Sequence, residues 1–517
     1  MRILIVYPNL PMMMTPALSV GLFTSICKKN NVGVDLFETT AYTDSIDTGM
    51  RLKTKLGNGR MFKPEDLSVM VKPTDQIIPD FREKVLSFQP DLLLFSVVED
   101  TLKDTKMLLD SIFDLDIDHV IGGVWPINAP EKCLEENSIN TICRFEGELV
   151  LEDIIIAYQN GDDWKNTRGL WYKKDGKIIK NDNQPLVDLN RVMPDYSLYP
   201  SERFNRPMGG KIVKSVGVET YRGCPYQCTF CNSPMQRHLD KNYLRRKSID
   251  VVKAELTNYV KLYNPNFWFI IDDSFVARPR NELFELLKVI KGFNIPWWCN
   301  TRLENVDPDI LDAMAEAHCS RITFGIESGD EEYRRKYLLR NVSDELYLSK
   351  ADELNQSGIP YSLNIVIGFP DETKEMVMKG AKLIKQIGGN DSLAVSIFIP
   401  YHGTILRNIA IEKGYLDRDW ISGNGYLVDG SPLRMPKPYL QKDEIQDLAN
   451  KFKYYTFFDE SHWGVIDRIK DTSQYETIYN EYMPKLAVGG KDHLRLKEKN
   501  IWACSAPRDM DIRNVAV

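Results

Sequence analysis

The chain has 517 residues, of which 43% are hydrophobic and 27% charged, and its formal net charge is −7. This length exceeds what one ordinary hydrophobic core holds, so two or three domains are expected in a globular protein. The acidic balance argues against nucleic acid as the main partner, because phosphate backbones are bound by clustered Lys and Arg.

The first ten residues, MRILIVYPNL, form a short apolar run that passes directly into polar sequence. The run lacks the length and cleavage site of a signal peptide. No stretch approaches 18 consecutive apolar residues, so no membrane span is predicted. The nine cysteines are expected to be reduced thiols rather than a disulfide framework. These features together predict a cytoplasmic location.

Residues 1–160 alternate short apolar runs with amphipathic stretches. The predicted strands cover 3–8, 32–38, 91–98, 119–123 and part of 139–148, and the predicted helices cover 17–29, 78–89 and 101–115. This alternation is typical of a doubly wound, Rossmann-like parallel sheet. Ligands of such sheets bind at the carboxyl ends of the strands. The residues expected at those ends are Tyr7, Pro8, Asn9, Ser96, Gly122, Gly123, Glu146, Gly147 and Glu148.

Residues 161–213 have a different texture. A small hairpin is predicted around Asp175 and Gly176, followed by a connection rich in Pro and Asn. We interpret this region as an interdomain linker.

Residues 214–405 contain six strand-like runs separated by helical segments. The runs cover 216–223, 267–272, 296–302, 321–327, 360–368 and 393–400. Repeated strand–helix units predict a parallel barrel, complete or partial, whose chemistry lies at the carboxyl ends of the strands. Residues 406–517 have weaker periodicity and are predicted to be mainly helical or irregular, with one amphipathic helix over 442–458.

Three cysteines stand together after the first of these strands, in YRGCPYQCTFCNSP (221–234). Thiolates bind zinc, copper or iron–sulfur clusters. A structural zinc site takes four ligands, and the nearest further candidates are Cys299, Cys319 and His238. A 4Fe–4S cluster normally takes four cysteines, so three would leave one iron with an open coordination position. The spacing favours the cluster and keeps incidental or zinc-bound cysteines as the alternative.

The CPYQCTFC motif resembles the hallmark of the radical S-adenosylmethionine (SAM) superfamily. The resemblance implies that Cys224, Cys228 and Cys231 hold a 4Fe–4S cluster. It also implies that SAM chelates the fourth iron and is cleaved reductively to a 5′-deoxyadenosyl radical. An external one-electron reductant of the flavodoxin or ferredoxin type is the implied partner.

Further segments resemble the SAM-binding strand ends of this superfamily. They are IDDSF (271–275), WCNTR (298–302), FGIESGDEE (324–332) and IVIGFPDET (365–373). The implied SAM contacts are Phe230, Asp272, Arg302, Glu327, Ser328, Gly368 and Pro370. Tyr401 and His402, in PYHGT (400–404), are candidates for a substrate or proton-donor role, with an ordinary turn as the alternative.

The first domain resembles the cobalamin-binding domain of one large radical SAM class. The resemblance is carried by residues 121–155, with Gly–Gly after a strand and Glu–Gly–Glu before the last helix. The implied cobalamin contacts are Ser96, Gly122, Gly123, Glu146 and Gly147. The DxHxxG motif is absent, and His119 lies on a strand, so no histidine ligation is predicted. The lower face of cobalamin would then be shielded near Ser96, Val97 or Trp125; a domain that binds nothing is the alternative.

The resemblance predicts a cobalamin-dependent methyltransferase acting on an unactivated carbon, or a phosphinate phosphorus, of a small molecule. A radical cyclase, rearrangement or oxidation enzyme without methyl transfer is the first alternative. RNA methylthiolation is a second, although Cys27, Cys133 and Cys143 are not at the required spacing. A corrinoid or iron–sulfur sensor without enzymatic activity is the third.

Overall fold

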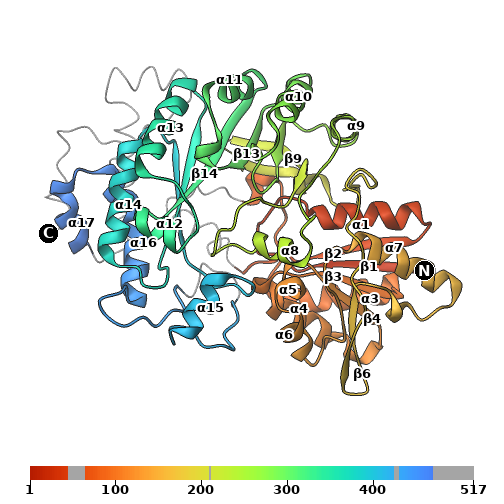
Figure 1. Cartoon of the computed structure of the whole chain (residues 1–517). Coiled ribbons are helices and arrows are strands. Elements are labelled where there is room, and N and C mark those ends of the chain that lie inside the picture. Colours follow the sequence, from red (N-terminus) through yellow and green to blue (C-terminus); the bar gives the residue numbers. More distant parts are fainter. Residues whose placement is uncertain (45–63, 209–210, 424–429, 470–517) are drawn as a thin grey trace.

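The computed structural model describes residues 1–44, 64–208, 211–423 and 430–469. Two seven-stranded sheets organise these residues, one in the N-terminal part and one in the central part of the chain (Figure 1). No described helix is long and apolar enough to cross a bilayer.

The first sheet has the strand order β2-β1-β3-β4-β5-β6-β7. Its strands are β1 (Arg2–Tyr7), β2 (Gly33–Glu38), β3 (Leu92–Ser96), β4 (Asp118–Gly122), β5 (Thr141–Cys143), β6 (Leu170–Lys174) and β7 (Lys177–Lys180). The first five are parallel, which confirms the predicted doubly wound sheet.

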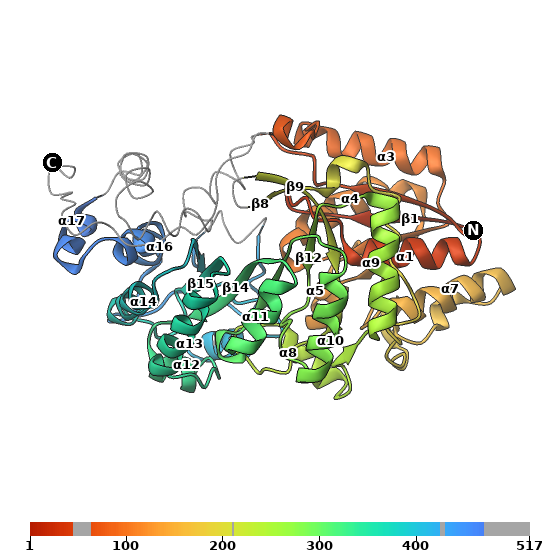
Figure 2. The ribbon, with the colours of Figure 1, turned by 90° about the horizontal axis from the view of Figure 1, so that it is seen from above.

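Helices cover both faces of the first sheet (Figure 2). One face packs on α1 (Leu18–Lys29) and α7 (Glu148–Asn160), and the other on α3 (Ile77–Phe88) and α4 (Leu102–Ser111), with α5 (Val124–Asn128) and α6 (Pro130–Glu135) after β4. Alternation along β3 explains the two cores: Leu92 and Leu94 join one core, and Leu93 joins the other.

The predicted hairpin exists as β6 and β7, but its position differs from the expected linker. β6 pairs antiparallel with β5, so the hairpin extends the first sheet. The turn is at Asp175 and Gly176, which both have positive φ. Sequence patterns reveal a hairpin, but they do not reveal which sheet edge it joins. The domain boundaries drawn from the sequence stay predictions.

The second sheet has the order β16-β15-β14-β13-β12-β9-β8. Its strands are β8 (Asn205–Met208), β9 (Lys211–Val218), β12 (Phe267–Ile270), β13 (Trp297–Thr301), β14 (Cys319–Glu327), β15 (Tyr361–Ile367) and β16 (Ser392–Ile397). The last six are parallel, while β8 is antiparallel. Five of the six predicted runs match a strand closely, and the run at 216–223 overlaps only the end of β9. This half-barrel confirms the predicted partial barrel.

Helices pack on one face of the half-barrel. They are α9 (Ile249–Tyr263), α10 (Arg280–Lys291), α11 (Pro308–Glu316), α13 (Asp344–Ser357) and α14 (Lys374–Ile387). Trp268 and Trp297 point into this core and are fully buried. Their neighbours Phe269 and Trp298 therefore lie on the opposite, inner face.

Short elements follow the strand ends. They are β10 (Tyr221–Arg222), α8 (Ser233–Leu239), β11 (Arg245–Arg246) and α12 (Glu331–Lys336). The C-terminal region contributes α15 (Ile405–Glu412), α16 (Lys442–Phe457) and α17 (Trp463–Arg468). α16, which was predicted over 442–458, packs against α14 and β16. The predicted irregular tail, with Cys504, lies outside the described residues.

Candidate active site

The three clustered cysteines lie on the loop that follows β9 and β10, at the carboxyl end of the half-barrel. All three are partly buried, and burial raises the pKa of each thiol, to about 12 for Cys224. Gly223 precedes them with φ +92°, and a Cβ there would lie 2.9 Å from the Tyr243 ring. The start of the loop therefore requires glycine.

Hydrogen bonds from other elements fix the path of this loop. Arg237 of α8 donates to the Pro225 carbonyl at 2.5 Å. The Thr229 hydroxyl donates to the Tyr337 carbonyl at 2.5 Å, and the Leu406 amide donates to the Thr229 carbonyl at 3.0 Å. The thiols are thus presented by a backbone that is tied on several sides. A preorganised loop of this kind suits a bound cluster.

Arg302, at the end of β13, lies near the cysteines. Burial raises the pKa of Cys228, and the positive charges of Arg340 and Arg302 oppose that rise. The Arg302 guanidinium lies 3.8 Å from the centre of the Tyr226 ring, and its Nε is 2.8 Å from Glu304. Its Nη2 is buried without a hydrogen-bond partner in the described part of the chain. An unsatisfied guanidinium beside the thiols fits the carboxylate of SAM.

Asp272, which follows β12, was predicted to contact SAM; that contact stays a prediction, and the structure shows how the side chain is held within the protein. The carboxylate is 1% exposed and is fully engaged. It accepts hydrogen bonds from the amides of Thr220 and Tyr221 and forms a 2.7 Å ion pair with Arg278. Asp272 therefore fixes the end of β9, from which the cysteine loop departs.

The adjacent residue, Asp273, takes the position near the cysteines. Its negative charge acts on the thiols of Cys224 and Cys231 and raises the pKa of both. Its carboxylate accepts a 2.9 Å hydrogen bond from Ser233, two residues after Cys231. Successive side chains point to opposite sides of an extended chain. The sequence shows the Asp–Asp pair, but it does not show which of the two side chains faces the cysteine loop.

The end of β14 holds Glu327 in an unusual conformation. Its φ is +66°, and burial raises the pKa of its carboxyl group while Arg340 opposes the rise. Arg340 Nη1 lies 3.3 Å from Glu327 Oε1. Backbone strain in a residue of this size is typical of functional sites. Ser328 is 1% exposed, and its hydroxyl accepts from the Asp330 amide, so it supports the turn.

The turn after β15 contains the predicted adenine-side residues. Gly368 has φ +91°, and a Cβ there would meet Ile445 of α16 at 2.9 Å. The Pro370 carbonyl accepts from the Tyr333 hydroxyl at 2.7 Å. Phe230 packs against Phe369, with ring centroids 5.7 Å apart. The structure thus brings Phe230 next to this turn, as a shared SAM pocket requires.

Sequence reasoning missed Glu372, which organises the same turn. Its carboxyl group is 1% exposed and accepts from the amides of Gly368 at 2.6 Å and Phe369 at 3.3 Å. Burial raises its pKa to about 8. The signal was its place in IVIGFPDET, two residues after Pro370.

The loop after β16 connects the half-barrel to the first sheet. The Tyr401 hydroxyl donates to Asp100 at 2.8 Å, and the His402 amide donates to Glu99 at 3.0 Å. The His402 ring also packs edge-on against Trp125 at 5.0 Å. Both predicted catalytic candidates are therefore held by residues that follow β3. A role in joining the two sheets explains these contacts.

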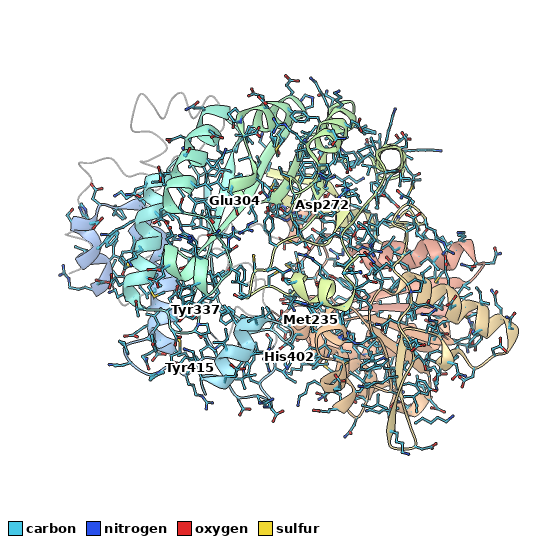
Figure 3. The ribbon with its side chains drawn as sticks, viewed as in Figure 1. Met235, Asp272, Glu304, Tyr337, His402 and Tyr415 are labelled. Atoms are coloured by element: carbon cyan, nitrogen blue, oxygen red, sulfur yellow. The ribbon has the colours of Figure 1, made fainter. Side chains whose placement is uncertain are left out.

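The first sheet therefore presents its carboxyl edge to the cysteine loop. In Figure 3, His402 and Met235 of α8 lie across the centre of the molecule from Asp272 and Glu304, which follow β12 and β13. Among the predicted cobalamin residues, Ser96 contacts Ser19 at 3.2 Å. Gly122 and Gly123 end β4, and Gly123 has φ +97° with no room for a Cβ beside Val97.

Trp125 is 1% exposed and belongs to the core of the first domain, so its side chain does not line an open face. Asn128, at the end of α5, differs from Trp125 because its side chain is polar. Both polar atoms of its amide are buried without a partner among the residues described. Its amide contacts Gly403 of the loop after β16, where a Cβ would lie 2.9 Å away.

Glu146 was predicted to contact cobalamin; that contact stays a prediction, and the structure shows its carboxylate in a network of protein contacts. Its carboxylate pairs with Arg222 at 2.8 Å and with Arg245, and it also accepts from the Val187 amide at 3.0 Å. Arg222 is two residues before Cys224 and also pairs with Glu148 at 2.8 Å. Glu146 therefore ties the first sheet to the cysteine loop.

Gly147, the next predicted cobalamin residue, packs against the first helix of the domain. A Cβ at this position would lie 2.8 Å from the ring of Phe23 on α1. The close approach of the aromatic ring explains why glycine stands at the start of α7.

The cysteines of the first domain do not form a second thiol site. Cys27 and Cys143 are buried in one core of the domain, and Cys133 is buried in the other. Burial raises the pKa of each to about 12. These residues pack as small apolar side chains, which argues against the RNA methylthiolation alternative.

Sequence comparison identifies the half-barrel. Residues 218–384 match the radical SAM superfamily. An uncharacterized methyltransferase of Pyrococcus horikoshii is 26% identical over 351 residues, which cover 66% of this chain and 74% of that protein. The anaerobic magnesium-protoporphyrin IX monomethyl ester cyclase of Rubrivivax gelatinosus is 24% identical, covering 59% of this chain and 56% of the cyclase.

Structure comparison extends the likeness to both sheets. The radical SAM methyltransferase TsrM from Kitasatospora setae, solved with cobalamin and a 4Fe–4S cluster, superposes with a TM-score of 0.61 at 16% identity. The match covers 89% of this chain and 82% of TsrM. The cobalamin-dependent SAM radical enzyme OxsB, with aqua-cobalamin bound, gives 0.63 at 16% identity, covering 96% and 74%. The two-sheet architecture is therefore shared with these enzymes.

Proposed function

Because this chain is a radical SAM enzyme, we propose that it is a cobalamin-dependent methyltransferase that acts on a small molecule. A 4Fe–4S cluster, when bound, supplies the electron that cleaves SAM to a 5′-deoxyadenosyl radical. Cobalamin, when bound, supplies a carrier for the methyl group. The external reductant in this proposal is a flavodoxin- or ferredoxin-type protein.

The residues of the half-barrel divide the binding of cluster and SAM between them. Cys224, Cys228 and Cys231 supply three thiolates on a tied loop. Arg302, whose Nε pairs with Glu304, offers its unsatisfied Nη2 to the SAM carboxylate, and Asp273 offers a carboxylate on the same side as the cysteines. Burial raises the pKa of the three thiols and so favours their protonated form. Metal binding reverses this preference, because a metal-bound thiol is deprotonated.

One observation carries the cobalamin part of the proposal. The Asn128 amide is buried and unsatisfied at the carboxyl edge of the first sheet. It contacts the loop that is hydrogen-bonded to the cysteine loop, through Asn232 and His402. A buried unsatisfied amide costs about 1–3 kcal/mol, which an amide-rich ligand such as cobalamin would recover. The architecture shared with TsrM and OxsB supports the same interpretation.

Anaerobic reconstitution tests the proposal. With iron, sulfide and cobalamin, the protein is expected to elute with the absorbance of both a 4Fe–4S cluster and a corrinoid. With dithionite and SAM it should form 5′-deoxyadenosine, and label from the SAM methyl group should be recovered with the corrinoid. Cluster formation without corrinoid retention would overturn the methyltransferase assignment and favour a radical cyclase or oxidation enzyme.

Asn128→Leu sharpens this test because its two effects have opposite signs. Leucine removes two unsatisfied polar atoms, so the protein without cobalamin should become more stable to thermal unfolding. Corrinoid retention should fall at the same time. Asn205→Leu is a matched control, because the Asn205 amide donates to the Leu67 carbonyl at 2.9 Å. It should lower stability and leave corrinoid retention unchanged.

A further inference from the structure

Arg206, on β8, is a cation that lacks an anionic partner among the described residues. Its guanidinium lies 4.1 Å from the ring centre of Phe269 and 4.8 Å from that of Trp298. The guanidinium donates one hydrogen bond, to the Thr15 hydroxyl at 3.1 Å. Within the described ranges, no carboxylate lies at ion-pair distance, and burial lowers its pKa to about 10.

The position of Arg206 is set by the inner face of the half-barrel. Phe269 and Trp298 are adjacent on that face, with ring centroids 4.8 Å apart. Along β13, Trp298, Asn300 and Arg302 alternate on the same side. Four residues of extended chain span about 13 Å. Arg206, which stacks on Trp298 near the start of β13, and Arg302, at its end, are therefore cations at the two ends of this face of the strand.

A second arginine on this face is paired with a carboxylate, which is the usual arrangement for an arginine inside a protein. Arg321 of β14 donates to Asp391 at 2.6 Å, so its charge is neutralised within the protein. Two aromatic rings near Arg206 attract its charge by cation–π contact. They do not supply the hydrogen-bond acceptors that a guanidinium uses. A desolvated cation of this kind is matched by an anion that arrives from outside.

We propose that Arg206 binds an anionic group of the substrate, a carboxylate or a phosphoryl group, above the Phe269–Trp298 surface. The proposal rests on the proposed function, because it assigns the inner face of the half-barrel to the substrate. The guanidinium fork can form two parallel bonds to either anion. The Thr15 contact also gives the first domain a residue beside the substrate. The substrate is therefore an acid with an apolar or aromatic part, rather than a neutral or cationic molecule.

Calorimetric titration of the protein reconstituted with iron and sulfide, without cobalamin or SAM, tests this subsite. The probes are inorganic phosphate and acetate, in separate titrations. Millimolar binding of at least one is expected in the wild type, and the stronger of the two identifies the phosphoryl or carboxylate class. Arg206→Met should weaken that binding at least tenfold. Arg280→Met is the matched control: Arg280 is exposed and paired with Asp307, and its loss should change nothing.

Equal binding by wild type and R206M, equal weakening in R280M, or no binding by the wild type would each overturn the proposal. Phenylglyoxal labelling of the wild type gives a measurement that needs no variant. Mass spectrometry should find Arg206 modified, and the bound anion should protect it. Neither measurement depends on cobalamin or turnover, so a failed subsite can be distinguished from a failed function.

Discussion

The side-chain amide of Asn232, the residue after Cys231, donates a hydrogen bond of 3.1 Å to the main-chain carbonyl of His402. The His402 amide in turn donates to Glu99, which follows the third strand of the first sheet. The cysteine loop and the first sheet are thus two hydrogen bonds apart. A ligand at the carboxyl edge of the first sheet would therefore lie beside whatever the cysteines bind.

Replacing one of the clustered cysteines tests the metal site. Cys228→Ala should abolish cluster absorbance and reduce 5′-deoxyadenosine formation to background, because two thiolates do not hold the cluster. Iron content and absorbance after anaerobic reconstitution measure this. Cys299→Ala is the control, because Cys299 is fully buried in the helix-covered core. A C228A protein with a normal cluster would contradict the assignment.

The strands and the cysteine site could be predicted from local patterns. Each of the six parallel strands of the half-barrel overlaps an apolar run, although β9 begins five residues before its run, because a parallel sheet buried by helices needs continuous apolar sequence. The CPYQCTFC motif is also local. Its position after the first parallel strand follows from chain order alone.

The partners of the predicted site residues depend on long-range pairing. Asp272 and Asp273 look equivalent in sequence, and only the contacts with Arg278 and with the amides of Thr220 and Tyr221 show that Asp272 is the buried one. Glu146 looks like a free strand-end carboxylate, but its partner Arg222 lies 76 positions later. Arg206 gave no sequence signal, because the lack of an anionic partner among the described residues is a property of the folded chain.

Arg302→Met should weaken SAM binding while leaving the cluster intact. A hydrogen bond to a charged group contributes about 1.5–3 kcal/mol, so the Kd for SAM should rise about 10- to 100-fold. Equilibrium dialysis with labelled SAM measures this, and cluster absorbance checks the loop. The exposed Arg280 provides the control substitution, R280M. Unchanged SAM affinity in R302M would remove Arg302 from the site.

Glu146→Gln should destabilise the junction between the sheets. Its side chain is 8% exposed, and breaking a buried ion pair costs about 3–5 kcal/mol. The exposed Glu135, paired with Lys132, is the control, and E135Q should cost less than about 1 kcal/mol. Urea unfolding measures both variants. Similar losses in the two would show that the network contributes little.

The lowered pKa of Glu146 also predicts that the free energy of unfolding falls at acidic pH. Burial alone would raise its pKa, but the hydrogen bond from Arg245 and the charge of Arg222 outweigh burial and lower the pKa below 4.5. Its contribution is therefore present above pH 4.5 and is lost as the pH falls through the folded pKa. E146Q should lose less stability than the wild type on acidification. The same loss of stability on acidification in both proteins would refute this.

The raised pKa of Glu372 predicts the opposite dependence of the free energy of unfolding on pH. Burial raises its pKa from 4.5 to about 8, so between those values the folded chain holds a proton that the unfolded chain releases. Stability should then fall as the pH rises through this window, by at most about 1.4 kcal/mol per pH unit. Glu372→Gln can still accept from the Gly368 and Phe369 amides, and it should flatten this decline. Thermal melts from pH 5 to 8 compare it with E375Q, a substitution at an exposed site on α14. A decline equally steep in E372Q and the wild type would show that Glu372 is already ionised in the folded protein.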